Sequence, residues 1–253
     1  MNGGWYFISD AHIRQRDSPD ERAKQQHLRS LLEHLHGRAE RLFVVGDLFD
    51  YWFEYASVVP RRGGRILAAL ADLVDDGVSV VLFGGNHDWW VGRSIAEEYG
   101  IQVHHGPLWL EAGGKRLYVD HGDGLGLSNH RYGLVRGILH HPCAIRAFAF
   151  LHPDWGAWMA RLVNRGSNRR NEAERSALQR VPVFEAIANE VFAAGADIAV
   201  FGHVHAARIE VRRDGLLVVL GDWISLGTYG ELTDGVFHLR TWRAPDLPPW
   251  PAS

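Results

Sequence analysis

Five apolar runs in this chain each lead directly into a short segment of acidic, amide or imidazole side chains. Residues 42–45 are typical, because four apolar residues precede Gly46 and the carboxylate of Asp47 follows at once. A buried parallel strand has this composition, and the ligands of open α/β sheets collect at the carboxyl ends of such strands. Asp47 alone would fit a helix cap equally well. Because the pattern recurs, it predicts a functional site at one edge of a sheet.

The five segments together supply carboxylate, amide and imidazole ligands and no thiolate. Such a donor set suits borderline-hard divalent cations such as Mn²⁺, Fe²⁺ or Zn²⁺. Two cations about 4 Å apart repel each other, so a carboxylate with two oxygens would be a suitable bridge between them. The segments are Asp10-Ala11-His12, Gly46-Asp47, Gly85-Asn86-His87-Asp88, His121-Gly122-Asp123 and Gly202-His203-Val204-His205.

Each segment alone is a weak indication of a metal site. An isolated Asp-x-His pair is usually a cap or a surface feature, a Gly-Asn-His-Asp run fits a turn, and a His-x-His pair fits a sheet face. Five such segments, all placed where apolar strands end, are difficult to explain as unrelated turns. The joint pattern therefore favours a metal centre.

The rest of the chain predicts an α/β fold with a mixed sheet system. Strands alternate with amphipathic helices over residues 19–35 and 66–74, and short strands dominate after residue 198. The runs at 209–220 and 235–242 indicate antiparallel hairpins, and residues 245–253 are expected to form a loose end. Residues 124–176 break the alternation with an Arg-rich and aromatic-rich stretch. We interpret this stretch as a helical cap inserted over the strand ends of a single domain, residues 1–253.

Composition excludes several classes of protein. Apolar residues make up 46% of the chain, charged residues 23%, and the net charge is -3, so there is no basic excess to favour nucleic acid. The single cysteine, Cys143, excludes an internal disulfide and a Cys-based zinc site, consistent with a reducing compartment. The N-terminus has no signal-peptide pattern. No uncharged apolar run approaches the roughly 20 residues of a membrane-spanning helix.

The order of the five segments resembles the calcineurin-like metallophosphoesterase superfamily, over residues 6 to about 225. The resemblance implies two packed mixed β-sheets flanked by helices, with two divalent metal ions at the strand ends. It assigns Asp47 as the ligand that both ions share. The remaining ligands of the first ion would be Asp10, His12 and His205, and those of the second would be Asn86, His121 and His203.

The resemblance also implies a mechanism. A hydroxide activated by both ions attacks phosphorus in line, and His87 protonates the leaving oxygen or stabilises its charge. Asp88 is expected to orient the His87 ring. The alternative for His87 is a purely structural role in the turn.

Three further features resemble the UDP-2,3-diacylglucosamine pyrophosphohydrolase branch of the superfamily, which acts in lipid A assembly. They are the stretch over residues 47–54, the Asn129 and Tyr132 side chains after His121, and the insertion rich in Arg and aromatic residues. The branch implies hydrolysis to UMP and 2,3-diacylglucosamine 1-phosphate, with Mn²⁺ as the expected ion. It also implies a peripheral location on the cytoplasmic side of the inner membrane, and gives no oligomeric state.

Arginine suits the diphosphate, and an apolar groove would suit the acyl chains. The expected substrate contacts are Asn86, Asn129, Tyr132, Ser167, Arg169 and Arg170. The apolar cap residues either line the groove or simply pack the cap on the body; they are Phe148, Phe150, Leu151, Trp155, Trp158, Met159, Leu162 and Val163. Trp89, Trp90, Asp222 and Trp223 either wall the site or pack.

Three alternatives remain at this level. Enterobacterial members of the branch carry Arg where this chain has His87. The His form is the general superfamily form and also resembles a second, related group found in other Gram-negative bacteria, so the resemblance leaves the exact lipid substrate open. A soluble nucleotide or another phosphoester competes as the substrate. A non-catalytic, metal-stabilised module on the same fold would have lost a ligand or His87, and all of these are present. A nuclease would be expected to show a basic excess.

Overall fold

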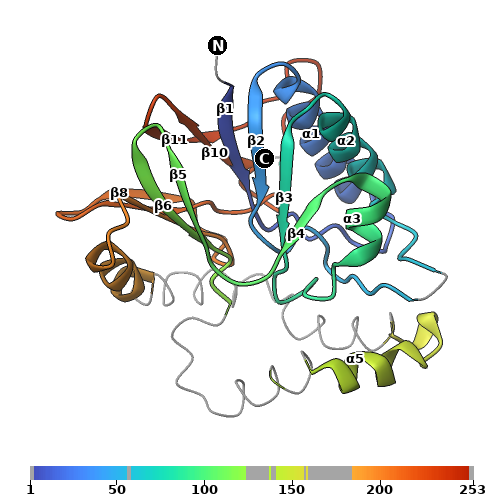
Figure 1. The fold of residues 1–253 in the computed structure, drawn as a ribbon. Coiled ribbons are helices and arrows are strands. Elements are labelled where there is room, and N and C mark those ends of the chain that lie inside the picture. Colours follow the sequence, from blue (N-terminus) through green and yellow to red (C-terminus); the bar gives the residue numbers. More distant parts are fainter. Residues whose placement is uncertain are drawn as a thin grey trace.

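The computed structural model describes residues 3–55, 58–123, 137, 141–156, 158 and 184–250. Within these residues the chain forms two mixed β-sheets with helices on their outer faces (Figure 1). The α/β fold class expected from the sequence is therefore confirmed. Residues 124–136, 138–140, 157 and 159–183, which make up most of the expected cap, lie outside the described residues.

The first sheet has the strand order β11-β10-β1-β2-β3-β4. Strands β1, β2, β3 and β4 are parallel to one another (Figure 1). Strand β10 pairs antiparallel with β1, and β11 pairs antiparallel with β10. In chain order the strands are β1 (Gly4–Ile8), β2 (Ala39–Val44), β3 (Ser79–Phe83), β4 (Gln102–His104), β10 (Thr228–Thr233) and β11 (Val236–Thr241).

The second sheet has the strand order β5-β6-β7-β9-β8. Strands β6, β7 and β9 are parallel, and β5 and β8 flank them in antiparallel pairings. In chain order the strands are β5 (Leu108–Ala112), β6 (Lys115–Asp120), β7 (Ile198–Phe201), β8 (Arg208–Val211) and β9 (Leu216–Val219). The β8–β9 hairpin expected over residues 209–220 is present, and β9 also pairs with β7.

The central strands are apolar on both faces because each face meets a different core. In β1, Phe7 points into the core between the two sheets, where it stacks on Phe43 of β2. The neighbouring Ile8 points the other way, into the core beneath the helices. Because both faces are buried, the strands are apolar at successive positions. In a sheet with one face in solvent, apolar and polar residues would alternate.

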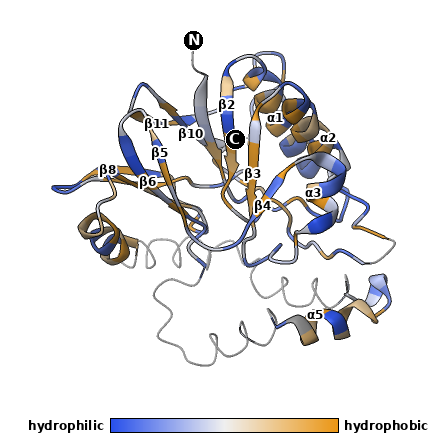
Figure 2. Cartoon of the chain, in the orientation of Figure 1, coloured by the Kyte–Doolittle hydropathy of each residue, from blue (hydrophilic) through white to orange (hydrophobic). Residues whose placement is uncertain are grey.

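Helices α1 (Pro19–Leu35), α2 (Gly64–Asp75) and α3 (Arg93–Tyr99) cover the outer face of the first sheet (Figure 1). Ser18 caps α1 by accepting a hydrogen bond from the Glu21 amide, and the leucine stripe at 28, 31, 32 and 35 is buried, as the sequence predicts. In Figure 2 the hydrophobic colour runs along β3 and much of α2. A helical stretch over residues 184–193 packs on the second sheet through Phe184.

The expected loose end is wrong for residues 245–250. The Trp250 side chain is only 8% exposed, and its ring lies 6.2 Å from the Trp223 ring and 5.7 Å from the His27 ring of α1. The Pro248 carbonyl oxygen lies 3.0 Å from the His27 imidazole. Burial of a large aromatic ring ties this segment to α1, a contact over more than two hundred residues that a local sequence pattern does not contain. Residues 251–253 lie outside the described residues.

Candidate metal centre

The five predicted segments meet at one edge of the two sheets. Each follows the carboxyl end of a parallel strand: β1, β2, β3, β6 or β7. Three overlapping groups of donor atoms result, and within each group all donor atoms lie within 4.8 Å of one another. Two of them match the expected ligand sets: the first group consists of Asp10, His12 and His205, and the second group of Asp47, His121 and His203. The other joins His87, which is not an expected ligand, to His12 and Asp47.

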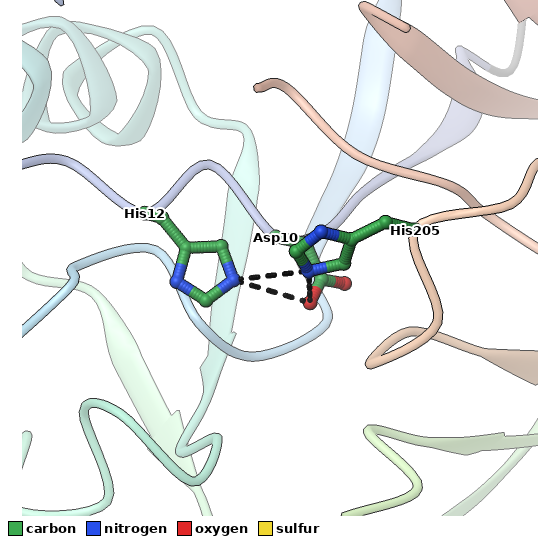
Figure 3. A group of neighbouring side chains, drawn as sticks. All are labelled: Asp10, His12 and His205. Atoms are coloured by element: carbon green, nitrogen blue, oxygen red, sulfur yellow. Dashed lines mark hydrogen bonds and ion pairs between the residues drawn. The ribbon is translucent and has the colours of Figure 1, made fainter. Parts of the chain in front are cut away.

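In the first group, the imidazoles of His12 and His205 both face one carboxylate oxygen of Asp10 (Figure 3). Asp10 Oδ1 lies 3.6 Å from His12 Nε2 and 3.4 Å from His205 Nε2, and these two nitrogens are 3.3 Å apart. No described residue donates a well-directed hydrogen bond to this buried oxygen. A buried carboxylate oxygen without a donor is costly, and a cation between these atoms would remove the cost.

Asp47 joins the two groups through one atom. Its Oδ2 lies 3.5 Å from His12 Nε2 on one side and 3.5 Å from His121 Nε2 on the other. On the second side, His121 Nε2 is also 3.4 Å from the Asn86 side-chain oxygen. The carboxylate is 1% exposed, so water does not screen it. These positions fit the expectation of a bridging ligand, and the oxygen and imidazole donors fit divalent cations.

The backbone at the site is held in an uncommon conformation. Asp10, His12, Asp47 and His203 all have positive φ, between 43° and 65°. Residues with side chains rarely adopt this left-handed region, and such strain collects at functional sites. The motif glycines allow the close packing that results, because a Cβ at Gly85 would overlap with Asp47 Oδ1.

The side-chain atoms of His121 and Asp10 that point away from the proposed metal positions have hydrogen-bond partners in the protein. His121 Nδ1 lies 2.8 Å from the Val45 carbonyl oxygen, which leaves Nε2 toward the centre. Asp10 Oδ2 accepts from the His203 amide at 2.8 Å and from the Ser9 hydroxyl. Outer partners of this kind orient metal ligands and raise their basicity.

His87 lies at the centre but takes a different partner from the one expected. Its ring is 4.6 Å from the His12 ring, and its Nδ1 is 3.6 Å from Asp50 Oδ1 and 3.3 Å from the Asp50 carbonyl oxygen. The expectation that Asp88 orients this ring is corrected, because Asp88 points beneath the loop. There it accepts from the backbone amides of Asp47, Phe49 and Gly85. Asp50 therefore lies where a residue that orients the His87 ring would lie. Asp88 instead holds the backbone of the two loops together through its hydrogen bonds.

The electrostatics of the protein alone favour cations. Burial by itself would raise the pKa of Asp10, but the His12 and His205 imidazoles outweigh it and hold the pKa well below its usual range. Burial likewise would raise the pKa of Asp47, and nearby imidazoles, His121 first, lower it. Both carboxylates are therefore ionised at neutral pH.

Two further groups at the site are shifted in the opposite direction. Burial would lower the pKa of His87, yet the carboxylates of Asp47 and Asp50 raise it to about 9. Burial and repulsion from Asp47 raise the pKa of Asp88 to about 7. In the protein alone, His87 is therefore a proton donor at neutral pH, and a cation on Asp47 would weaken that effect.

Sequence reasoning gave no role to Asp50 and left Asp222 open between walling the site and packing. Asp50 lies in an irregular turn, and no periodic pattern singles it out. Asp222 is buried near His205, and here a usable pattern existed: the apolar run of β9 ends in Gly221-Asp222, as the run of β2 ends in Gly46-Asp47. The expected substrate contacts Asn129, Tyr132, Ser167, Arg169 and Arg170 lie outside the described residues, as do the cap residues Met159, Leu162 and Val163.

The described part of the cap attaches beside this site. Helix α5 (Pro142–Ala149) places the Phe148 ring 4.7 Å from Phe53 and 4.9 Å from Trp90, so these residues pack the cap on the body. In contrast, Phe150, Trp155 and Trp158 are 92%, 69% and 56% exposed. Trp223 is fully buried and packs; the Trp89 ring lies 4.6 Å from the His105 ring.

The sequence model of the calcineurin-like phosphoesterases matches residues 6–207. The chain therefore belongs to this family and is a metal-dependent hydrolase, as the geometry of the strand ends leads one to expect.

Within the family, the chain is similar to curated UDP-2,3-diacylglucosamine hydrolases. The protein from Porphyromonas gingivalis is 32% identical over 248 residues, covering 90% of this chain and 94% of that protein. The protein from Neisseria meningitidis serogroup B is 28% identical, covering 86% and 89%. The protein from Haemophilus influenzae is 26% identical, covering 86% and 90%.

Proposed function

We propose that the protein hydrolyses the diphosphate of UDP-2,3-diacylglucosamine to UMP and 2,3-diacylglucosamine 1-phosphate. The observation that carries the reaction type is the buried Asp47 carboxylate, one oxygen of which lies 3.5 Å from an imidazole of each donor group. Similarity to UDP-2,3-diacylglucosamine hydrolases over most of both chains supports the substrate. The product of the reaction serves lipid A biosynthesis.

Two divalent cations, Mn²⁺ in our proposal, would supply Lewis-acid stabilisation of a phosphoryl group and a hydroxide at neutral pH. Asp47 would hold both ions. The first would also be bound by Asp10, His12 and His205, and the second by Asn86, His121 and His203.

His87 would act on the leaving group. Its ring lies 4.6 Å from the His12 ring, beside the donor atoms, so it would be placed to donate a proton to the oxygen that leaves phosphorus. Asp50, beside Nδ1, would keep the other ring nitrogen turned toward the substrate. The role of the expected cap contacts, Asn129, Tyr132, Ser167, Arg169 and Arg170, stays a proposal: they would bind the sugar and phosphate groups.

An apolar cavity supports a lipid substrate. A space of about 260 Å³ lies between α5 and the body, lined by Ile145 of α5 and by Phe53, Glu54, Trp89, Trp90, Val91 and His105. Three of its lining residues, Trp89, Trp90 and Val91, directly follow the His87-Asp88 turn in the chain, and most of its wall is apolar. We propose that it receives part of an acyl chain while the diphosphate occupies the metal centre.

The exposed aromatic residues of the cap support a location at a membrane. Among the helices that the structure describes, none combines the length and apolar character needed to cross a bilayer. Phe150, Trp155 and Trp158 instead present large exposed rings, which suit the boundary between lipid head groups and water. We propose that the protein works as a peripheral enzyme on the cytoplasmic face of the inner membrane.

The test compares substrates at matched detergent and Mn²⁺ concentrations. Hydrolysis of UDP-2,3-diacylglucosamine should exceed that of UDP-N-acetylglucosamine by orders of magnitude in kcat/KM, with UMP as a product. Bis(p-nitrophenyl) phosphate serves as the control, because a working metal centre should hydrolyse it whatever the natural substrate is. Equal kcat/KM for the two UDP-sugars would favour a soluble nucleotide substrate instead.

A further inference from the structure

A sixth strand end reaches the metal centre. Strand β9 runs parallel to β7, so its carboxyl end lies at the same edge as His205. The chain leaves β9 as Leu220-Gly221-Asp222, and the Asp222 side chain is 1% exposed. A buried carboxylate needs polar or charged partners, and both oxygens of Asp222 have them.

One oxygen of Asp222 is held by its own loop. Asp222 Oδ1 accepts hydrogen bonds from the backbone amides of Ile224 at 2.8 Å, Ser225 at 2.6 Å and Leu226 at 3.1 Å. The next residue ties the loop to the first metal segment, because the Trp223 amide donates to the Asp10 carbonyl oxygen at 3.1 Å. The carboxylate is therefore fixed relative to Asp10.

The other oxygen faces His205. Asp222 Oδ2 lies 3.6 Å from His205 Nδ1 and also contacts the Ser225 hydroxyl at 3.2 Å. The opposite ring nitrogen, Nε2, is turned toward Asp10 and His12, as Figure 3 shows. The imidazole thus lies between a carboxylate on one nitrogen and the cluster of metal donors on the other.

We propose that Asp222 is a positioning residue that keeps the proton of His205 on Nδ1 and strengthens Nε2 as a metal ligand. The partner of His205 Nδ1 is negatively charged, whereas that of His121 Nδ1 is neutral, the Val45 carbonyl oxygen at 2.8 Å. The ligand set of Asp10, His12 and His205 therefore depends on the Asp222 carboxylate. This inference rests on the proposed two-metal centre and not on the lipid substrate.

The variant Asp222→Asn separates the two roles of the side chain. Its amide oxygen can still accept from the three loop amides, so the loop should keep its conformation. Its amide nitrogen is a donor and cannot accept a hydrogen bond from the N–H at His205 Nδ1. Calorimetric titration of the metal-free protein with Mn²⁺ should show two ions per chain in the wild type. In the variant, one of the two should bind about 10- to 100-fold more weakly, the usual effect of losing such a partner.

Two comparisons assign the effect to His205. Asp197→Asn removes a carboxylate that accepts from the Arg116 amide at 2.8 Å, near the amino end of β7, and should bind both ions as the wild type does. In a His205→Ala background, Asp222→Asn should cause no further loss of affinity, because its effect passes through the missing ring.

Wild-type binding of both ions by Asp222→Asn would overturn the inference, as would equal weakening of both ions or a further loss in the His205→Ala background. Each of these results leaves the substrate comparison untouched. Conversely, a failure to prefer the lipid substrate would count against the proposed function while leaving the role of Asp222 intact. The metal-free melting temperature of Asp222→Asn should match that of the wild type, which checks that the loop still folds.

Discussion

At the level of single residues, the Asp47 carboxylate contacts both donor groups and the turn that carries His87. One carboxylate oxygen faces both donor groups, and the other accepts a hydrogen bond from the His87 amide at 2.9 Å. Asp47 therefore joins the metal-binding atoms to the turn that carries the expected proton donor. The close approach of Gly85 leaves no room for a side chain beside it.

We expect Asp47→Ala to lose both metal ions and all measurable turnover. Removal of a shared ligand leaves the two ions with fewer donors and with unscreened mutual repulsion. Metal content per chain after dialysis measures the effect, and Asp50→Asn is the matched control because it leaves both donor groups intact. Two ions per chain in Asp47→Ala would rule out the bridging role.

For His87→Ala we expect two bound ions and a kcat lowered by about 10² to 10⁴, the usual contribution of a positioned acid. The ring contacts His12 but is not among the proposed ligands, so metal content should not change. His104→Ala, on the edge strand β4, is the control for loss of an imidazole. A kcat near that of the wild type would reject the acid role and support a structural one.

The residue types at the site could be predicted from sequence, but their partners could not. Asp10, His12, Asp47, Asn86, His121, His203 and His205 each follow an apolar strand, which is a local pattern. The pairing of His87 with Asp50 instead depends on how two loops fold together. Asp88 was misassigned for the same reason, since its neighbour in sequence is His87 whereas its hydrogen bonds reach back to residues 47 and 49.

At the level of elements, α1 supports the metal segment that follows β1. Lys24 Nζ donates to the His12 carbonyl oxygen at 2.8 Å and pairs with Glu21 at 2.9 Å, and both side chains are buried. Glu21 in turn accepts from the Arg14 amide at 3.3 Å. The first turns of the helix thus hold the backbone of residues 12–14, where His12 has its positive φ.

We expect Lys24→Met to lower the free energy of unfolding by about 3–5 kcal/mol, because it leaves the Glu21 carboxylate buried without its partner. Denaturation of the metal-free protein by urea measures this directly. The double variant Glu21→Gln/Lys24→Met removes the uncompensated charge and should be more stable than Lys24→Met alone. If the double variant is less stable than Lys24→Met, the loss of stability does not come from an unpaired Glu21 carboxylate.

At the level of the whole molecule, the two sheets share a core and bring their strand ends to one edge, where the cap attaches. The alternation of strands and helices predicted parallel pairing in the first half of the chain. The insertion of β10 beside β1 and the packing of Trp250 against Trp223 could not be predicted, because they join segments far apart in sequence. The apolar cavity under α5 likewise depends on how the cap sits on the body.

The exposed rings of the cap give a prediction for the whole protein at a membrane. We expect Phe150→Ser/Trp155→Ser/Trp158→Ser to bind phosphatidylethanolamine–phosphatidylglycerol vesicles at least about tenfold more weakly than the wild type, since tenfold corresponds to only about 1.4 kcal/mol. Co-sedimentation measures this, and metal content should stay at the wild-type level. Trp109→Ser is the control, because this 37% exposed ring lies on β5 and not on the cap. Equal binding by the triple variant and the wild type would show that the cap does not face the membrane.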